Sequence, residues 1–366
     1  MIFLAFVAPL FSGYAYDEIV TALNAKGRKK AAVGISPRVP AIHEMVTGEP
    51  YDDIYADKTF LFGTDAGVVH AIRGINLDLQ KGETVAIVGE SGSGKSVTMK
   101  AAVGLLDSNA TINSGEILYT YDDGHGQDKT VDLLKLSKKQ LRTEYNGQRL
   151  AMVFQDPMAS LNPRKKVGDI ISEGMDIHHR FANRQEREEK ISEMLKKVGL
   201  SPEHAARYPH QFSGGQRQRV GIARALIMNP KLIIADVCIS ALDVSIQAQV
   251  VNLMKDIQAE TQCAYLFIAH DLSMVKYISD RIGVLHLGYM VESGTKEEIF
   301  SHPVHPYTKS LLSAIPHPNP VVEKHRVALT YNYATSGIDY AKGTEHSVGG
   351  THTVPATDEE FDAWTK

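Results

Sequence analysis

The chain has 366 residues, 43% hydrophobic and 22% charged, which is typical of a soluble globular protein and long enough for two domains of about 150 residues or one large domain with appendages. The net charge of -4 lacks the basic excess of nucleic-acid-binding proteins, so we expect no nucleic acid partner. The two cysteines, Cys238 and Cys263, form neither a disulfide framework nor a metal-ligand cluster, which agrees with a reducing cytosol.

The amino-terminal stretch, residues 1–11, is apolar throughout. It is shorter than the ~20 residues that a membrane-spanning helix needs. A signal peptide begins with a basic region, but the first basic residue here is Lys26. We therefore interpret the stretch as the cut end of a longer segment rather than as a targeting signal.

From Gly67 onward the pattern predicts an α/β domain. Residues 69–79 alternate in places between apolar and polar side chains, as in a half-exposed strand. Four short apolar runs predict strands buried on both faces of a parallel sheet: 84–88, 149–154, 231–235 and 264–269. Helices are expected at 97–106 and, with a charged solvated face, at 185–198. The tail after Ile315 has no clear period, so we expect it to be loosely packed.

A glycine-rich loop follows the run at 84–88 and fits the pattern GxxxxGKS. It consists of Gly89, Glu90, Ser91, Gly92, Ser93, Gly94, Lys95 and Ser96. Glycines let backbone N–H groups surround phosphates at a helix N-terminus. In such a loop the lysine reaches the β- and γ-phosphates and the last hydroxyl binds Mg²⁺. A chance glycine-rich turn is the alternative, but the position between a strand and a helix favours an ATP site.

The run at 231–235 is followed directly by a carboxylate, Asp236. An aspartate at the end of a buried strand is where nucleotide-binding proteins of the phosphate-loop class hold Mg²⁺. Many strands end in aspartate, so this observation is weak alone. Downstream of a phosphate loop it predicts a second Mg²⁺ ligand.

A second glycine motif, residues 212–219, reads Phe-Ser-Gly-Gly-Gln-Arg-Gln-Arg. It resembles the signature of ATP-binding-cassette (ABC) transporters, with phenylalanine where leucine is more usual. A serine and two glycines at a helix start form an anion-binding terminus; the alternative is a simple helix cap. The resemblance implies that Ser213, Gly214, Gly215 and Gln216 face the γ-phosphate held by an opposite subunit, so that two cassettes close around two nucleotides.

Further motifs of the family occur in the expected order. Gln155 resembles the family's glutamine that contacts Mg²⁺ and the attacking water. Asp243 resembles the aspartate that acts across the dimer interface, and His270 resembles the histidine beside the γ-phosphate. Phe62, with Phe60 as the alternative, lies at about the distance of the aromatic residue that stacks on adenine. Each of these residues alone would more often be structural. Their common order favours the family.

The resemblance implies an α/β fold: a phosphate-loop NTPase cassette with a mostly parallel sheet core, an antiparallel β subdomain and a helical subdomain. The implied boundaries are a cassette at 66–315, its helical subdomain at about 156–229, and a carboxy-terminal extension at 316–366. Repair proteins of the family insert long coiled coils and translation factors carry two cassettes. Neither feature occurs in this sequence.

Two motifs narrow the resemblance to ATPases of oligopeptide and dipeptide importers: residues 154–163 and the run His305-Pro306-Tyr307-Thr308. The resemblance implies peptide transport by a peripheral subunit on the cytoplasmic face of the membrane. Implied partners are a second ATPase subunit, identical or different, two permease subunits and an extracytoplasmic peptide-binding protein. The residues themselves show no peptide specificity, because an ATPase subunit does not touch the cargo.

The sequence departs from the family after Asp236, where Val237 and Cys238 replace a glutamate that is usually followed by proline. That glutamate orients and polarises the attacking water, and general-base contributions are worth about 10²–10⁴-fold in rate. Valine can do neither. We therefore expect the chain to bind Mg-ATP and to hydrolyse it slowly or not at all. The alternative function is a non-hydrolysing structural partner of an active ATPase subunit.

The front end departs as well, because parts of residues 1–65 resemble the permease subunit of the same importers. The resemblance rests on residues 8–14 and 62–65. The first half of the cassette also resembles one importer ATPase, and the part from about Phe154 onward resembles the other. We hypothesise a fusion of three neighbouring genes; the alternative is a native amino-terminal extension. Sequencing the genomic locus across Asp65 and Phe154 decides between them.

Overall fold

The computed structural model describes residues 33–36, 59–64, 67–106, 110–122, 128–154, 160–236, 244–269, 272–315, 323 and 328–366. The chain divides into two compact units. Unit 1 comprises Met1–Tyr16, Gln80–Glu83 and Lys135–Ile268, and unit 2 comprises Asp17–Leu79, Thr84–Leu134 and Ala269–Lys366. The apolar stretch 1–11 and the permease-like residues 8–14 lie outside the described residues.

In the described part of unit 2, five strands follow one another in a sheet in the order β13-β14-β12-β11-β4. β4 and β11 are parallel, and the remaining neighbours pair antiparallel. Every residue of β4 is buried, as the apolar run at 84–88 predicts. The bounds are β4 Thr84–Val88, β11 Arg281–His286, β12 Tyr289–Thr295, β13 Thr344–Gly349 and β14 His352–Ala356.

Two smaller antiparallel sheets belong to the same unit. One has the order β1-β6-β7 and the other β3-β2-β5. Their strands are β1 Val33–Ser36, β2 Thr59–Thr64, β3 Gly67–Arg73, β5 Ala110–Ile112, β6 Glu116–Asp122 and β7 Asp128–Asp132. The strand predicted at 69–79 therefore ends early, because Gly74 has a φ of 94° that leaves the extended conformation.

The helices of unit 2 are α3 Lys95–Ala102, α11 Leu272–Ile278, α12 Lys296–Ser301, α13 Pro306–Ser313, α15 Tyr333–Ser336 and α16 Asp358–Trp364. A 3-10 turn, η2 Leu133–Lys135, stands where the chain passes from one unit to the other. α3 is shorter than the helix predicted at 97–106, because Gly104 takes a left-handed φ of 65° soon after its end.

The expectation of a loosely packed tail after Ile315 is wrong for the part that the structure describes. β13 and β14 form a hairpin, and Thr353 of β14 pairs with Ser293 of β12. His352, Val354 and Ala356 are buried at every second position. This alternation is not evident from the sequence, because the first buried residue is a histidine. Its Nε2 lies 2.7 Å from the buried Glu292 carboxylate.

The described part of unit 1 contains three parallel strands in the order β10-β9-β8. They are β8 Leu150–Val153, β9 Leu232–Asp236 and β10 Ala264–Ile268. All their residues are buried apart from the half-exposed Asp236, which confirms the prediction of strands covered on both faces.

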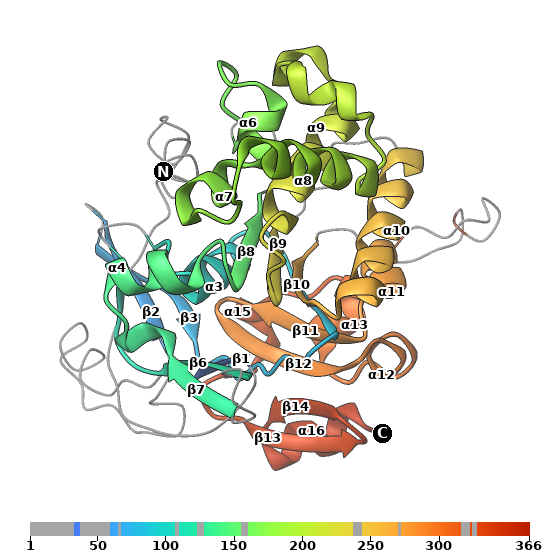
Figure 1. The fold of residues 1–366 in the computed structure, drawn as a ribbon. Helices are drawn as coiled ribbons and strands as arrows, with labels where there is room; N and C mark the ends of the chain where they lie inside the picture. Colours follow the sequence, from blue (N-terminus) through green and yellow to red (C-terminus); the bar gives the residue numbers. More distant parts are fainter. Residues whose placement is uncertain are drawn as a thin grey trace. The chain divides into compact units, whose positions relative to one another are not determined.

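Helices make up most of the remaining described part of unit 1 (Figure 1). They are α4 Lys138–Gln140, the π-helical turn η3 Leu141–Tyr145, α6 Val167–Ile171, α7 Glu173–His178, α8 Arg184–Lys197, the 3-10 turns η4 Pro202–Ala206 and η5 Pro209–Gln211, α9 Gly214–Leu226 and α10 Val244–Thr261. α8 confirms the helix predicted at 185–198, with Ile191, Met194 and Leu195 on its buried side.

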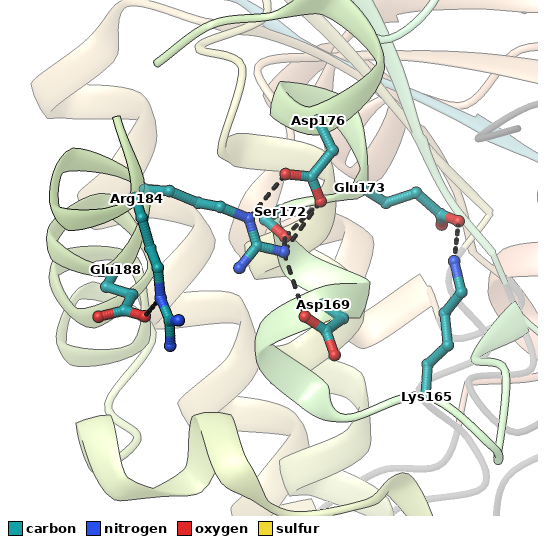
Figure 2. A network of polar contacts seen from close by, with 8 residues as sticks. Lys165, Asp169, Ser172, Glu173, Asp176, Arg184 and Glu188 are labelled. Carbon is teal, nitrogen blue, oxygen red and sulfur yellow. Dashed lines mark hydrogen bonds and ion pairs between the residues drawn. The ribbon is translucent and has the colours of Figure 1, made fainter. Parts of the chain in front are cut away.

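A polar network around Arg187 of α8 connects this helix with α6 and α7 (Figure 2). The guanidinium donates hydrogen bonds to Asp176 at 2.7 Å, to Ser172 at 2.6 Å and to Asp169 at 3.1 Å. The Ser172 hydroxyl in turn donates to Asp176 at 2.9 Å. Three short helical segments are thereby held together by one planar group with several donors.

The pKa of Asp176 reports the strength of this network. Burial raises that pKa, but hydrogen bonds from Arg187 and Ser172 outweigh burial and bring it below its ordinary value of 3.8. A depressed carboxyl pKa contributes stability that is present above the unfolded pKa and is lost as the pH falls through the folded pKa. The network therefore stabilises the fold at neutral pH and fails in acid.

Replacing Asp176 by asparagine tests this dependence. We expect D176N to lower the free energy of unfolding by about 1–2 kcal/mol at pH 7, because a charge-assisted hydrogen bond is lost at a partly exposed site. The difference from the wild type should stay constant down to pH 5 and shrink below about pH 4. Urea unfolding at several pH values measures it.

The matched control is E188Q, which removes the carboxylate paired with Arg184 on the exposed face of α8, where the side chains are 89% and 56% exposed. Its effect should stay below about 0.5 kcal/mol. Equal losses in the two variants, or a difference for D176N that does not change with pH, would contradict the account.

Candidate functional site

The phosphate loop, residues 89–96, follows β4 and ends in the first turn of α3 in unit 2, which agrees with the predicted order of strand, loop and helix. Gly94 is the N-cap of α3, with a left-handed φ of 102° and no side-chain cap. Glycine has no side chain that could cap the first backbone N–H groups of α3, and an uncapped helix N-terminus suits a phosphate. Ser91 and Gly92 are exposed, whereas Ser93 and Lys95 are buried.

Two glycines of this phosphate loop are required by the backbone around it. A Cβ on Gly89 would lie 2.0 Å from the Leu285 carbonyl oxygen, and a Cβ on Gly94 would lie 2.4 Å from the Ala71 carbonyl oxygen. Neither approach is sterically allowed, and both residues have positive φ. Gly92 also has a positive φ, of 80°, but nothing lies within 4 Å of the position of its Cβ.

Lys95 lies across the loop and is 4% exposed. Its ammonium donates to the Gly89 carbonyl at 2.9 Å, to the Glu90 carbonyl at 2.5 Å and to the Ser93 hydroxyl at 3.2 Å. A buried positive charge is thus held within the ring of loop peptides. Its place fits the phosphates of a nucleotide.

The phosphate loop is also fixed from outside by other segments of unit 2. The Gly288 N–H donates to the Ser93 carbonyl at 3.1 Å, and the Glu90 N–H donates to the Tyr307 hydroxyl at 2.9 Å. The first contact comes from the turn between β11 and β12 and the second from α13. Tyr307 belongs to the subfamily motif at residues 305–308, but the sequence carries no local signal for its contact with the loop.

Asp236 is the last residue of β9 in unit 1, where its half-exposed side chain follows four buried residues. Ile268 of β10 pairs with it, and Val153 of β8 pairs with the preceding Ala235. The carboxyl ends of the three parallel strands therefore share one edge, which is where ligands bind in sheets of this kind. Gln155, Val237, Asp243 and His270 lie outside the described residues, so their predicted roles stay predictions.

The predicted signature forms the beginning of α9. Ser213 is the N-cap; its hydroxyl accepts the Gln216 N–H at 3.3 Å, and the Gln216 side chain accepts the Ser213 N–H at 3.0 Å. Gly215 is required for packing, since a Cβ there would lie 2.4 Å from the Ile246 side chain of α10. The motif is thus a helix cap in geometry, and its predicted role toward a partner's nucleotide stays a prediction.

Comparisons with known proteins agree with these motifs. The family described as ABC transporter matches residues 72–240, and the family described as Oligopeptide/dipeptide transporter, C-terminal region matches residues 291–335. Among relatives, the chain is 50% identical over 305 residues to the oligopeptide transport ATP-binding protein OppF of Bacillus subtilis (strain 168), covering 83% of this chain and 95% of that protein. The chain belongs to the ABC transporter family.

A second ABC relative is the dipeptide transport ATP-binding protein DppF of Lactococcus lactis subsp. cremoris (strain MG1363), 49% identical over 310 residues, covering 85% of this chain and 95% of that protein. A solved dimeric structure of the ATP-binding cassette MJ0796 bound to ADP and Pi matches with a TM-score of 0.56 and 28% identity, over 65% of this chain and 96% of that one. The cassette cbiO1 from Clostridium perfringens matches with a TM-score of 0.53 and 26% identity, over 67% and 92%. These neighbours confirm the predicted α/β fold of ABC cassettes.

Two further observations concern the described residues alone. No helix among them is both long enough and apolar enough to span a membrane.

Phe62 lies on β2 of unit 2, where its backbone pairs with Val69 and Ala110. Its assignment as the ABC adenine-stacking residue, like that of Phe60, stays a prediction.

Substitution of the loop glycines tests the close contacts. We expect G94A to lower the free energy of unfolding by about 3 kcal/mol or more, because the new methyl group would overlap the Ala71 carbonyl oxygen in a strained conformation. G92A, the matched control, has only the cost of its positive φ, about 1 kcal/mol. Urea unfolding without nucleotide measures both values. Equal losses at the two positions would contradict the packing described here.

Proposed function

We propose that the chain is the ATP-binding subunit of an ABC importer for oligopeptides or dipeptides. The closed phosphate loop, with Lys95 held across it, is the observation that carries ATP binding. The peptide substrate class is supported by the names of the relatives and by the match of residues 291–335 to the carboxy-terminal region of oligopeptide and dipeptide transporters.

ATP fits the donors that the loop offers. Backbone N–H groups of the loop and the Lys95 ammonium supply positive charge to the phosphates, and Gly89 and Gly94 leave no side chain in the way. Bound Mg²⁺ would neutralise charge on the β- and γ-phosphates. The Ser96 hydroxyl and the Asp236 carboxylate are oxygen ligands of the kind that Mg²⁺ prefers.

The remaining proposed roles follow the family pattern. Gln155 would contact Mg²⁺ and the attacking water, His270 would act at the γ-phosphate, and Phe62 or Phe60 would stack on adenine. Ser213, Gly214, Gly215, Gln216 and Asp243 act across a dimer of cassettes. The N-cap position of Ser213 supports this, because the start of α9 carries positive potential of the sign that a phosphate requires.

We place the subunit on the cytoplasmic face of the membrane with two permease subunits, a second ATPase subunit and an extracytoplasmic peptide-binding protein. The dimeric structure of a similar cassette supports pairing. ATP-driven closure of the dimer would move the permeases, so that nucleotide binding is transmitted as a rigid-body motion.

The departure from the family pattern concerns ATP hydrolysis at the chain's own site. Val237 follows the last residue of β9, where the family has a glutamate that activates water. We infer that the site holds Mg-ATP and turns it over slowly or not at all. The signature on α9 remains available to complete a partner's site, which gives an asymmetric pair with one working site. A purely structural partner that never hydrolyses is the second candidate, and Val237 is the observation that favours it.

Restoring the glutamate tests this assignment. We expect V237E, assayed with the partner ATPase subunit, to raise the ATPase rate of this site by about 10²-fold or more, because the water regains a base. V237Q is the matched control, since it has the same shape without the charge and should give no such gain. A double variant, V237E/C238P, restores the usual local sequence. If neither V237E nor the double variant exceeds V237Q, the account of impaired hydrolysis is wrong.

A further inference from the structure

Tyr307 connects the carboxy-terminal region with the phosphate loop. It lies in the first turn of α13, within the segment that matches the oligopeptide/dipeptide transporter family. Its side chain is buried, 1% exposed, and its hydroxyl accepts the Glu90 N–H at 2.9 Å. Both residues belong to unit 2, although 217 positions separate them in the chain.

The peptide unit that Tyr307 bonds also bonds Lys95. The peptide unit between Gly89 and Glu90 donates its N–H to Tyr307 and offers its carbonyl to the Lys95 ammonium at 2.9 Å. Because the peptide is planar, fixing the direction of the N–H also fixes the direction of the carbonyl. Gly89 has a φ of 146°, which is freely open only to glycine, so its own sequence does little to hold this orientation.

The ring of Tyr307 contacts the rings of His286 and Tyr331. It stacks on His286, with ring centroids 4.0 Å apart and an angle of 25° between the planes. His286 Nδ1 lies 2.6 Å from the Tyr340 hydroxyl, which is 3.0 Å from the Tyr331 hydroxyl. The aromatic cluster of His286, Tyr307, Tyr331 and Tyr340 thus joins β11 to the tail of the chain.

The backbone of Tyr307 is held as well. Its N–H donates to His305 Nδ1 at 3.0 Å, and the His305 N–H donates to the Glu292 carboxylate at 3.0 Å. The same carboxylate, fully buried, also bonds the Val304 N–H and His352 Nε2, both at 2.7 Å. Burial lowers the pKa of His305 to about 3 and that of His286 to about 4, so both rings are neutral at physiological pH and the arrangement does not change there.

We propose that Tyr307 is a positioning residue of the nucleotide site, and that the carboxy-terminal region acts as a brace that sets the orientation of the Gly89–Glu90 peptide and, through it, of Lys95. The inference rests on the proposed function in so far as the loop binds ATP. It assigns a task to a region whose family match otherwise says nothing about nucleotide. A buried tyrosine that serves packing alone would need its ring but not its hydroxyl.

The experiment compares the full-length wild type with Y307F and Y331F. Y307F keeps the stacking on His286 and removes the hydroxyl that bonds Glu90. Y331F is the matched control, because its hydroxyl bonds Tyr340 and Ser336 in the same cluster and does not contact the loop. Hydrogen–deuterium exchange of the peptide containing residues 88–93 is measured without nucleotide, and dissociation constants for ATP and ADP are measured by isothermal titration calorimetry.

We expect Y307F to speed exchange in that peptide and to weaken ATP and ADP binding by about three- to tenfold, the range of one lost hydrogen bond. Y331F should leave the exchange and both affinities within about twofold of the wild type while losing similar thermal stability. Unchanged exchange in Y307F, faster exchange with unchanged affinity, or equal weakening in Y331F would each overturn the proposal. A wild type that binds no ATP refutes the proposed function instead, and the exchange data still test the contact of Tyr307 with the loop.

Discussion

The phosphate loop depends on how closely three stretches of backbone approach one another. The Leu285 and Ala71 carbonyl oxygens occupy the space that a Cβ on Gly89 or Gly94 would need. Gly288 completes the contact, since its N–H bonds Ser93 and its carbonyl accepts the Arg73 N–H at 2.7 Å. Backbone from β3, from β11 and from the turn after β11 therefore constrains the shape of the phosphate loop.

Much of this fold could be predicted from the sequence. Strands buried on both faces are continuous apolar runs in the sequence. The predicted bounds of β4, β8, β9 and β10 therefore agree with the structure to within about one residue at each end. The amphipathic α8 was found by its period. The strand β14 in the tail was not predicted, because its buried face begins with a histidine. The Glu292 carboxylate bonds His352 and makes its burial possible. A polar residue made compatible with burial by a distant partner leaves no periodic signal.

The candidate site divides in the same way. The loop and the start of α9 carry local patterns whose geometry the structure reproduces, whereas the contact of Tyr307 with Glu90 is purely tertiary. The residues proposed for ATP binding and for hydrolysis also lie in different units. The phosphate loop, with its glycines and Lys95, belongs to unit 2, whereas Val237, at the position of the family's catalytic glutamate, follows the last residue of β9 in unit 1. Under the proposed function, substitution of the water-activating residue after β9 would therefore leave the phosphate loop in unit 2 unchanged.

The central proposal, that this chain binds Mg-ATP and cleaves it slowly or not at all, is tested most directly by identifying the nucleotide that it retains. The purified chain is incubated with Mg²⁺ and radiolabelled ATP, separated from free nucleotide, denatured at successive times and analysed by chromatography. K95A, which lacks the ammonium within the loop, is the control for specific retention. The account predicts that the wild type retains ATP that stays intact, and that K95A retains none. Bound nucleotide that appears mainly as ADP, or a wild type that retains no more than K95A, would contradict it.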